Sequence, residues 1–329
     1  MIIIGGLPKP IGGVTSFLQR LVLLYNQEID LFIDLYPHRD KEVPISIVDK
    51  YFCLEKYKLP KIFYQKTNKS SVVFFNFSRL HSIIITIFLR KSEQNWHLML
   101  HHGDIELSFN NFILSFILRR FDYIYCLNEK QYSFYAKYIN ANKLIKTSSY
   151  ISIKDEDISC SKHTESLISD IRYKYDYVFC CSGFPSEIYR HDWSIEAVLN
   201  KSNAAIIVCL YGKGDMYKLQ QKFSSYENVF FFYYLSQDDF NFILKNADCY
   251  LRPNSVDSFG VAVADAISFG TTVIASNICP RYKGTVLFNS ESKKDFFNLI
   301  KSYPFKDKFS LKISNEDIMD FNLIKTIRN

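Results

Sequence analysis

The sequence predicts an α/β fold with two doubly wound parallel-sheet domains that face a central cleft. Three observations favour this fold. The chain has 329 residues, a length that suits two domains. Short apolar runs alternate with helical patterns in both halves, and polar or glycine-containing turns follow the runs. Apolar residues make up 48% of the chain, which supplies two cores and excludes a disordered protein.

The first half begins with an apolar run at residues 2–4 and a glycine turn that ends at Gly12 and Gly13. Apolar residues then recur at helical spacing as far as residue 25. Further apolar runs are bounded by polar segments and predict strands at residues 71–77, 97–100 and 123–127. Alternating strands and helices are typical of a parallel sheet that is covered on both faces.

The polar segment at residues 154–173 predicts a linker, and we place the boundary near residue 165. The domains are therefore 1–165 and 166–329, with a last helix that is free to pack back on the first domain. A helix over residues 260–269 is expected to end at Gly270, because glycine suits a left-handed cap. Strands are predicted in the second domain at residues 177–181, 204–211, 229–232, 249–252 and 272–275.

Charge and cysteine content narrow the classes of function. The formal net charge is +6, and the positive excess lies in the first half. This suits a phosphorylated ligand or an anionic surface, and the absence of a nucleic-acid motif argues against nucleic acid as a partner. Eight cysteines without CxxC spacing favour core thiols in a reducing compartment, so we expect a cytoplasmic protein without zinc.

Two segments combine an apolar run with a basic end, Arg79–Lys91 and Asn111–Arg120. Both are far shorter than the roughly 20 apolar residues that span a bilayer. They suit peripheral contact with anionic lipid at the inner face of the cytoplasmic membrane. The alternative is that each is a buried helix with charged ends.

The segment from Leu251 to Ser276 is the most informative. A strand leads through a polar loop to a helix that begins near Phe259 and Gly260, so backbone N–H groups and the positive helix end form an anion site. Ser258 and Asp257 lie directly before this site, and Asp265 lies in the helix. The two acids could accept hydrogen bonds from sugar hydroxyls. The alternative is that Asp257 caps the helix and Asp265 is a solvated helix residue.

This pattern resembles a known family. Asp257 and Asp265 are separated by seven residues, Phe259 and Gly260 lie between them, and the strand of residues 270–276 follows. The arrangement is similar to the E-x7-E signature of retaining glycosyltransferases of family four, and particularly to a bacterial branch that acts in surface-polysaccharide biosynthesis. The likeness spans about residues 176–288. It implies the GT-B fold, in which two Rossmann-like domains face each other.

The resemblance also implies roles for single residues. Asp265 takes the position that binds the nucleotide ribose, and Asp257 the position that meets the donor sugar, although both are Asp where the family has Glu. Arg190 takes the place of a basic residue that binds the diphosphate. Gly183 corresponds to a donor-binding turn, in which the family often has arginine after the glycine, and here Phe184 follows.

The resemblance implies further contacts to the donor through less specific motifs. Lys213 lies in a glycine turn near the position of the nucleotide base, and Gly12 and Gly13 correspond to a loop over the donor phosphates. His102, rather than His101, is the favoured contact to the donor sugar. Taken alone, these residues also suit ordinary turns. His101, His102 and Asp104 lack partners at metal-ligand spacing, so no metal site is expected.

The implied activity is transfer of a sugar from a nucleotide diphosphate sugar to a glycan, with retention of configuration. The nucleotide sugar is a co-substrate, and no cofactor is expected. The implied acceptor is an oligosaccharide on a polyprenyl diphosphate, in O-antigen or capsule synthesis. Two alternatives remain open: a sugar-nucleotide epimerase with the same fold, and a non-catalytic partner subunit.

Overall fold

The computed structural model describes residues 1–7, 13–39, 41–55, 58–59, 71–75, 94–100, 111–153, 158–212, 214–257, 259–305, 311–314 and 323–328. The chain divides into unit 1 (Met1–Ile151 and Met319–Asn329) and unit 2 (Ser152–Ile318). The division falls at residue 151 rather than near 165. The polar segment that suggested the later boundary contains the start of helix α6 (Lys162–Lys174), which Ser161 caps and which packs into the core of unit 2.

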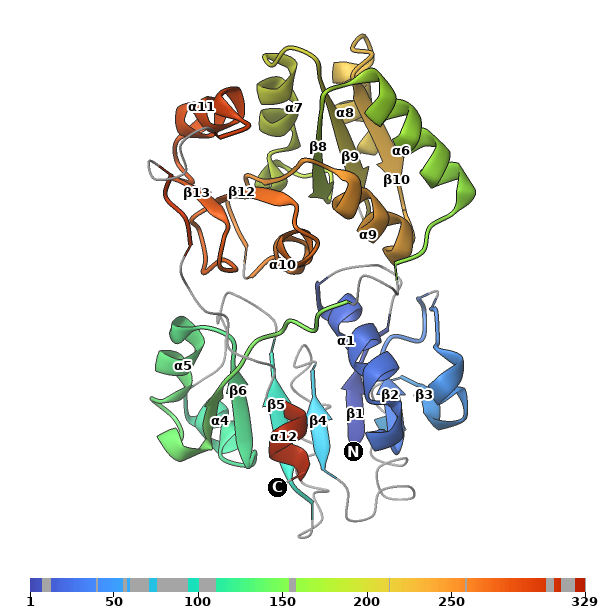
Figure 1. Cartoon of the computed structure of the whole chain (residues 1–329). Helices are drawn as coiled ribbons and strands as arrows, with labels where there is room; N and C mark the ends of the chain where they lie inside the picture. The colour runs from blue at the N-terminus through green and yellow to red at the C-terminus, as the bar shows by residue number, and fades with distance from the viewer. Residues whose placement is uncertain are drawn as a thin grey trace. The chain divides into compact units, whose positions relative to one another are not determined.

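Unit 1 contains a seven-stranded parallel sheet (Figure 1). Its strands, in spatial order, are β3 (Tyr51–Cys53), β2 (Leu31–Asp34), β1 (Ile2–Gly5), β4 (Val72–Phe74), β5 (Trp96–Met99), β6 (Tyr123–Cys126) and β7 (Leu144–Lys146). The predicted apolar runs form β1, β4, β5 and β6, which lie in the middle of the sheet. The sequence prediction missed β2, β3 and β7.

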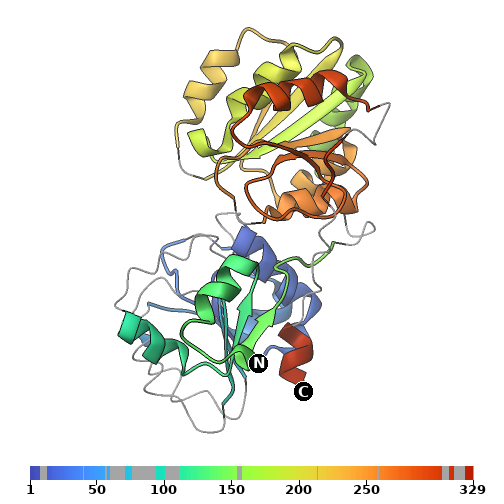
Figure 2. The same cartoon turned by 90° about the vertical axis from the view of Figure 1, so that its left-hand side faces the viewer.

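Both faces of this sheet are covered by helices (Figures 1 and 2). Helices α1 (Gly13–Leu24) and α12 (Leu323–Arg328) share one core cluster, in which Leu323 and Ile324 pack with residues of β1. Helices α4 (Asn111–Leu118) and α5 (Glu129–Tyr135) share the other. Among the described residues, 3₁₀ helices span Asn26–Glu28, Ile45–Lys50 and Ala141–Lys143.

Unit 2 contains a six-stranded parallel sheet. Its strands, in spatial order, are β10 (Val229–Tyr233), β9 (Ala204–Leu210), β8 (Tyr177–Gly183), β11 (Cys249–Arg252), β12 (Thr272–Ser276) and β13 (Val286–Phe288). The five strands that the sequence predicts are all present, and β13 was missed. Every residue of β9 and β11 is buried, as expected for strands covered on both faces.

The helices of unit 2 also form two layers. Helices α7 (His191–Leu199), α8 (Met216–Phe223) and α11 (Lys293–Ser302) pack on one face of the sheet. Helices α6, α9 (Gln237–Asn246) and α10 (Val261–Ser268) pack on the other. A 3₁₀ helix spans Glu187–Tyr189. Gly270 follows α10 with φ of 82°, which confirms the predicted left-handed cap.

The two segments with basic ends have different outcomes. Arg79–Lys91 lies outside the described residues. Asn111–Arg120 contains α4, in which Ile117 and Leu118 are buried in the core while Phe116 is 43% exposed. Across the ranges given above, none of the helices combines the length and the apolar character needed to cross a bilayer.

Candidate functional site

The predicted anion site lies in unit 2, where β11 leads into α10. The strand ends at Arg252 and the helix begins at Val261. Gly260 is the N-cap residue and adopts a left-handed conformation, with φ of 77°. A Cβ atom at this position would lie 2.9 Å from Nη1 of Arg281. The start of α10 therefore requires glycine for both conformation and space.

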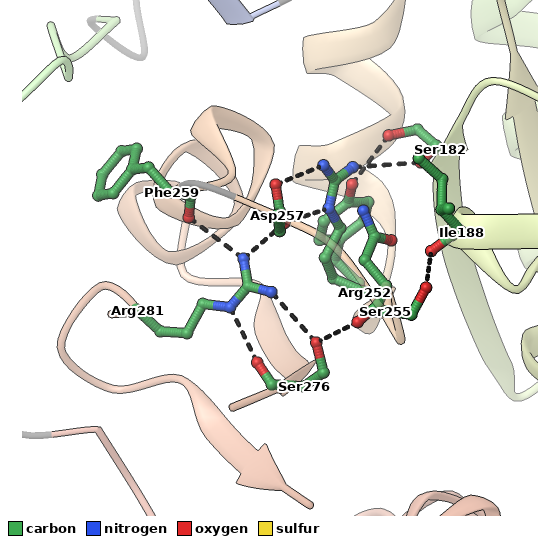
Figure 3. Close-up of polar contacts among 10 residues, drawn as sticks. Ser182, Ile188, Arg252, Ser255, Asp257, Phe259, Ser276 and Arg281 are labelled. Carbon is green, nitrogen blue, oxygen red and sulfur yellow. Dashed lines mark hydrogen bonds and ion pairs between the residues drawn. The ribbon is translucent and has the colours of Figure 1, made fainter. Parts of the chain in front are cut away.

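Asp257 is held between two arginines, one on each side (Figure 3). Nε and Nη2 of Arg252 donate to the carboxylate at 2.9 and 3.2 Å, which is a bidentate contact. Nη1 of Arg281 donates to Oδ2 of Asp257 at 2.7 Å. The side chains of Asp257 and Arg252 are each 9% exposed, and that of Arg281 is fully buried. The three residues form a buried ion cluster, which we call the Arg–Asp–Arg cluster.

Arg281 links this cluster to the end of β12. Its Nε donates to the carbonyl oxygen of Ser276 at 3.0 Å, and its Nη2 donates to Oγ of the same residue at 3.3 Å. Its Nη1 also donates to the carbonyl oxygen of Phe259 at 3.2 Å. Arg281 thereby fixes the loop before α10 against the neighbouring strand, as Figure 3 shows.

Arg252 links the cluster to the end of β8. Its Nη1 donates to the carbonyl oxygen of Ser182 at 3.3 Å, and its guanidinium lies over the ring of Tyr189 at 5.3 Å. This contact follows from the sheet, in which β8 and β11 are parallel neighbours with Leu251 beside Cys181. The guanidinium therefore lies at the carboxyl edge of the sheet, where doubly wound folds bind ligands.

The charges in the cluster support one another. Burial alone would raise the pKa of Asp257, but the positive charges of Arg252 and Arg281 hold that pKa well below its usual range. Burial would lower the pKa of Arg252, and the nearby Asp257 carboxylate instead holds it above its ordinary value. Asp257 and Arg252 are therefore both charged at neutral pH.

Asp265 lies in the second turn of α10 and is 1% exposed. Asp257 thus lies in the loop before α10 and Asp265 lies within the helix, as the sequence pattern predicted. Neither matches the alternative reading, because Gly260 caps the helix without a side chain and Asp265 is buried rather than solvated. Their contacts to a sugar and a ribose stay predictions. Phe259 is described, whereas Ser258 lies outside the described residues.

Arg190 caps α7 in a left-handed conformation, with φ of 50°. Its guanidinium lies over the ring of Trp193 at 4.2 Å. Its Nη1 donates to the carbonyl oxygen of Ser290 at 2.5 Å and to that of Pro253 at 3.4 Å. Arg190 therefore lies close to the end of β11, while its role as a diphosphate ligand stays a prediction.

The turn after β8 is packed with aromatic side chains. A Cβ atom on Gly183 would lie 2.0 Å from the ring of Tyr189, and one on Gly212 would lie 2.5 Å from the ring of Phe184. The glycines therefore make room for rings of the protein itself. His191 contacts the carbonyl oxygen of Phe184 through Nε2 at 3.0 Å, and burial lowers the pKa of this histidine to about 4. It is neutral at physiological pH and supplies no cation at the start of α7.

The remaining predicted residues lie elsewhere. Gly13 is exposed at the first position of α1 in unit 1. Gly12, His101, His102, Asp104 and Lys213 lie outside the described residues. Within the ranges that the structure describes, no group of His, Cys, Asp and Glu side chains is arranged to hold a metal ion.

Sequence reasoning missed Arg252 and Arg281 as site residues. Arg252 and Asp257 are only five residues apart in the sequence. An arginine shortly before the acid could therefore have indicated their ion pair. Arg281 follows Asp257 by 24 residues, and the two meet because the end of β12 returns to the loop before α10. Nothing in the local sequence around Arg281 indicates this contact.

Solved structures share this arrangement of two parallel sheets with helices on both faces. HepE from Anabaena in complex with UDP-glucose matches with a TM-score of 0.66 and 12% identity over 92% of this chain and 88% of that chain. WaaG, a glycosyltransferase involved in lipopolysaccharide biosynthesis, matches with a TM-score of 0.61 and 13% identity over 92% and 90%. A trehalose-6-phosphate structure from E. coli with UDP-2-fluoro glucose matches with a TM-score of 0.66 and 8% identity over 93% and 91%. The chain has the GT-B fold.

The family comparison points to one region. Residues 171–287 match the family described as "Glycosyl transferases group 1". This range contains the Arg–Asp–Arg cluster and α10. No curated protein sequence matches the chain.

Proposed function

We propose that the chain is a retaining glycosyltransferase that uses a nucleotide diphosphate sugar. The observation that carries the proposal is the carboxyl edge of the unit 2 sheet, where buried guanidinium groups surround the start of α10. Positive side chains and a helix N-terminus stabilise a diphosphate leaving group without a metal ion. The family match over residues 171–287 and the UDP-sugar complexes among the similar structures support it.

In the proposed reaction, the bond between the anomeric carbon and the donor phosphate oxygen breaks. The acceptor hydroxyl oxygen bonds to the same face of that carbon, and its proton passes to the departing phosphate oxygen. The products are a glycoside and a nucleoside diphosphate. We further propose that the acceptor is an oligosaccharide on a polyprenyl diphosphate, as in O-antigen or capsule synthesis.

Thermal unfolding with a panel of nucleotide sugars and nucleoside diphosphates tests donor binding. A ligand that binds the folded state raises the midpoint of unfolding by mass action. We expect one donor nucleotide to protect the parent protein and the Asp265→Ala variant to lose that protection. Asp170→Ala, which changes an exposed acid on α6, is the matched control and should behave like the parent. If the parent binds no nucleoside diphosphate, a non-catalytic partner subunit is favoured instead.

An activity measurement separates the transferase from an epimerase. Release of nucleoside diphosphate should depend on a lipid-linked glycan acceptor. Formation of an epimeric sugar nucleotide without acceptor would contradict the transferase.

We also propose peripheral contact with the cytoplasmic face of a membrane through the end of α4. Phe116 is exposed there, with the guanidinium of Arg120 over its ring at 5.4 Å. Arg119, Lys137 and Lys143 line a nearby surface recess. Cosedimentation with vesicles that contain phosphatidylglycerol should fall for Arg120→Gln relative to the parent, and neutral vesicles should bind neither. Equal binding of both proteins to anionic vesicles would contradict this contact.

A further inference from the structure

The resemblance leads us to expect a basic side chain after β8, and the structure shows uncharged groups both there and at the first residue of α7. Phe184 lies in the turn after β8, where its ring stacks on Tyr189 with centroids 5.8 Å apart. His191 is the first residue of α7 and is neutral because it is buried. Arg190, the N-cap residue of α7, is one cation near this edge, and a second cation from another element would strengthen the binding of a donor diphosphate.

Arg252 brings that charge from the neighbouring strand. It is the last residue of β11, and its Nη1 donates to the carbonyl oxygen of Ser182 near the end of β8. A guanidinium thus lies beside the backbone of β8 just before the turn that contains Phe184. Its side chain keeps 9% of its surface exposed at the edge of the sheet.

The Arg–Asp–Arg cluster carries more positive than negative charge. Arg252 and Arg281 make their ion pairs with the same carboxylate, that of Asp257. Because the three side chains are at most 9% exposed, water screens the remaining positive charge weakly. The start of α10 adds the partial positive charge of a helix N-terminus beside the cluster.

We propose that Arg252 binds the donor diphosphate in place of the basic residue missing after β8, and that Asp257 is its counter-ion rather than a ligand of the donor sugar. Arg281 is a positioning residue, since its hydrogen bonds go to Asp257, Ser276 and Phe259. This inference rests on the proposed function and assigns different roles within the same site.

The first test is Asp257→Asn, which keeps the shape of the side chain and removes its charge. If Asp257 is a counter-ion, the net charge of the cluster rises from one to two, and the affinity for UDP should increase about threefold or more. The gain should be larger for UDP than for UMP, because UDP carries more negative charge. If Asp257 instead reads the sugar, affinity for UDP stays unchanged and affinity for UDP-glucose falls. That second outcome, or weaker binding of UDP, overturns the proposal.

The second test compares Arg252→Gln with Arg252→Lys by calorimetry with UDP and UMP. The glutamine variant leaves Asp257 paired with Arg281, and it should bind UDP about tenfold more weakly with a smaller change for UMP. The lysine variant should recover most of the affinity. Lys293→Gln removes one positive charge at an exposed pair with Glu196, and it should stay within about twofold of the parent. Unchanged UDP binding by Arg252→Gln overturns the proposal.

These outcomes separate the inference from the proposed function. If the parent binds no nucleoside diphosphate, the proposed function fails. If the parent binds UDP and neither Arg252→Gln nor Asp257→Asn changes the affinity, only the role of the cluster fails. Asp257→Asn carries the test if Arg252→Gln is too unstable to purify.

Discussion

The carboxyl edges of the two sheets each contain a buried aspartate, and the partners of these aspartates differ. Asp34 ends β2 in unit 1 and is fully buried. It accepts hydrogen bonds from the backbone N–H groups of Leu7 and Tyr36 at 3.1 and 2.9 Å, and Nζ of Lys41 lies 3.2 Å from its carboxylate. Asp257 in unit 2 is held by two guanidinium groups.

The two edges differ in the charge that surrounds the buried carboxylate. At Asp34, one cation among the described residues pairs with the carboxylate, and neutral donors that include the hydroxyl of Tyr51 fill further acceptor sites. These contacts hold the loops around Asp34 in place, and the charges of Asp34 and Lys41 cancel. At Asp257, two cations of the described residues share one anion, so these three groups keep a net positive charge. Burial is common to both, and the number of cations separates them.

The largest expected effect is loss of stability when Asp257 is replaced by alanine. Two buried guanidinium groups would lose their counter-ion, which costs on the order of 3–5 kcal/mol in the free energy of unfolding. Urea denaturation with circular dichroism measures this loss, with the exposed Asp170→Ala variant as the control. Because the ligand supplies negative charge, UDP should stabilise Asp257→Ala more than the parent. A loss of stability below about 1 kcal/mol would show that the cluster does not depend on its acid.

The second prediction is that low pH lowers the stability of both units. Burial lowers the pKa of His97 in β5 and of His191 in α7 to about 4, with a smaller opposing effect of Asp122 on His97. Unfolded histidine has a pKa of roughly 6.5, so below that pH the unfolded state binds protons that the folded state does not. Stability should fall as pH drops from about 6.5 to about 4, by up to about 3 kcal/mol for each histidine.

Denaturation curves at a series of pH values check this dependence. His97→Gln and His191→Gln should each flatten the profile in this range, because glutamine does not titrate. If both variants keep the slope of the parent, groups other than these histidines cause the acid sensitivity.

The third prediction is that Asp34→Asn destabilises unit 1 without changing the donor site. The amide keeps the shape but leaves Lys41, whose side chain is 8% exposed, without its charge partner. We expect a loss of about 1–3 kcal/mol. Calorimetry should give the same affinity for UDP as in the parent. A weaker affinity for UDP would contradict the contrast between the two edges, because it would give Asp34 a part in binding.

Much of the fold could be predicted because central parallel strands are continuous apolar runs. Residues 204–210 are all buried and were recognised as a strand, whereas β7 and β13 have only three residues each and lie at sheet edges. The boundary was placed too late because exposed polar residues at the start of α6 resemble a linker. A short edge strand or an exposed helix start carries little of the apolar periodicity on which such prediction depends.

The site could be predicted in part for a similar reason. The glycine start of α10 and its two acids are local in sequence, so their spacing identified them. The partners of Asp257 depend on tertiary structure: Arg252 belongs to a strand that lies beside β8, and Arg281 to a loop that follows β12. The position of Arg252 beside the end of β8 is visible only once the strands are placed side by side.

The smallest effect is expected at Glu196, which also lies between two cations. Its carboxylate is 3.0 Å from Nζ of Lys222 and 2.8 Å from Nζ of Lys293, yet it is 32% exposed and both lysines are more exposed still. Water and salt screen such pairs, so Glu196→Gln should cost less than about 1 kcal/mol, and the cost should shrink as salt is added. Denaturation at low and high salt measures this. Because Glu196 and Asp257 have the same number of cationic partners, a cost for Glu196→Gln as large as that for Asp257→Ala would mean that burial does not set the strength of the Arg–Asp–Arg cluster.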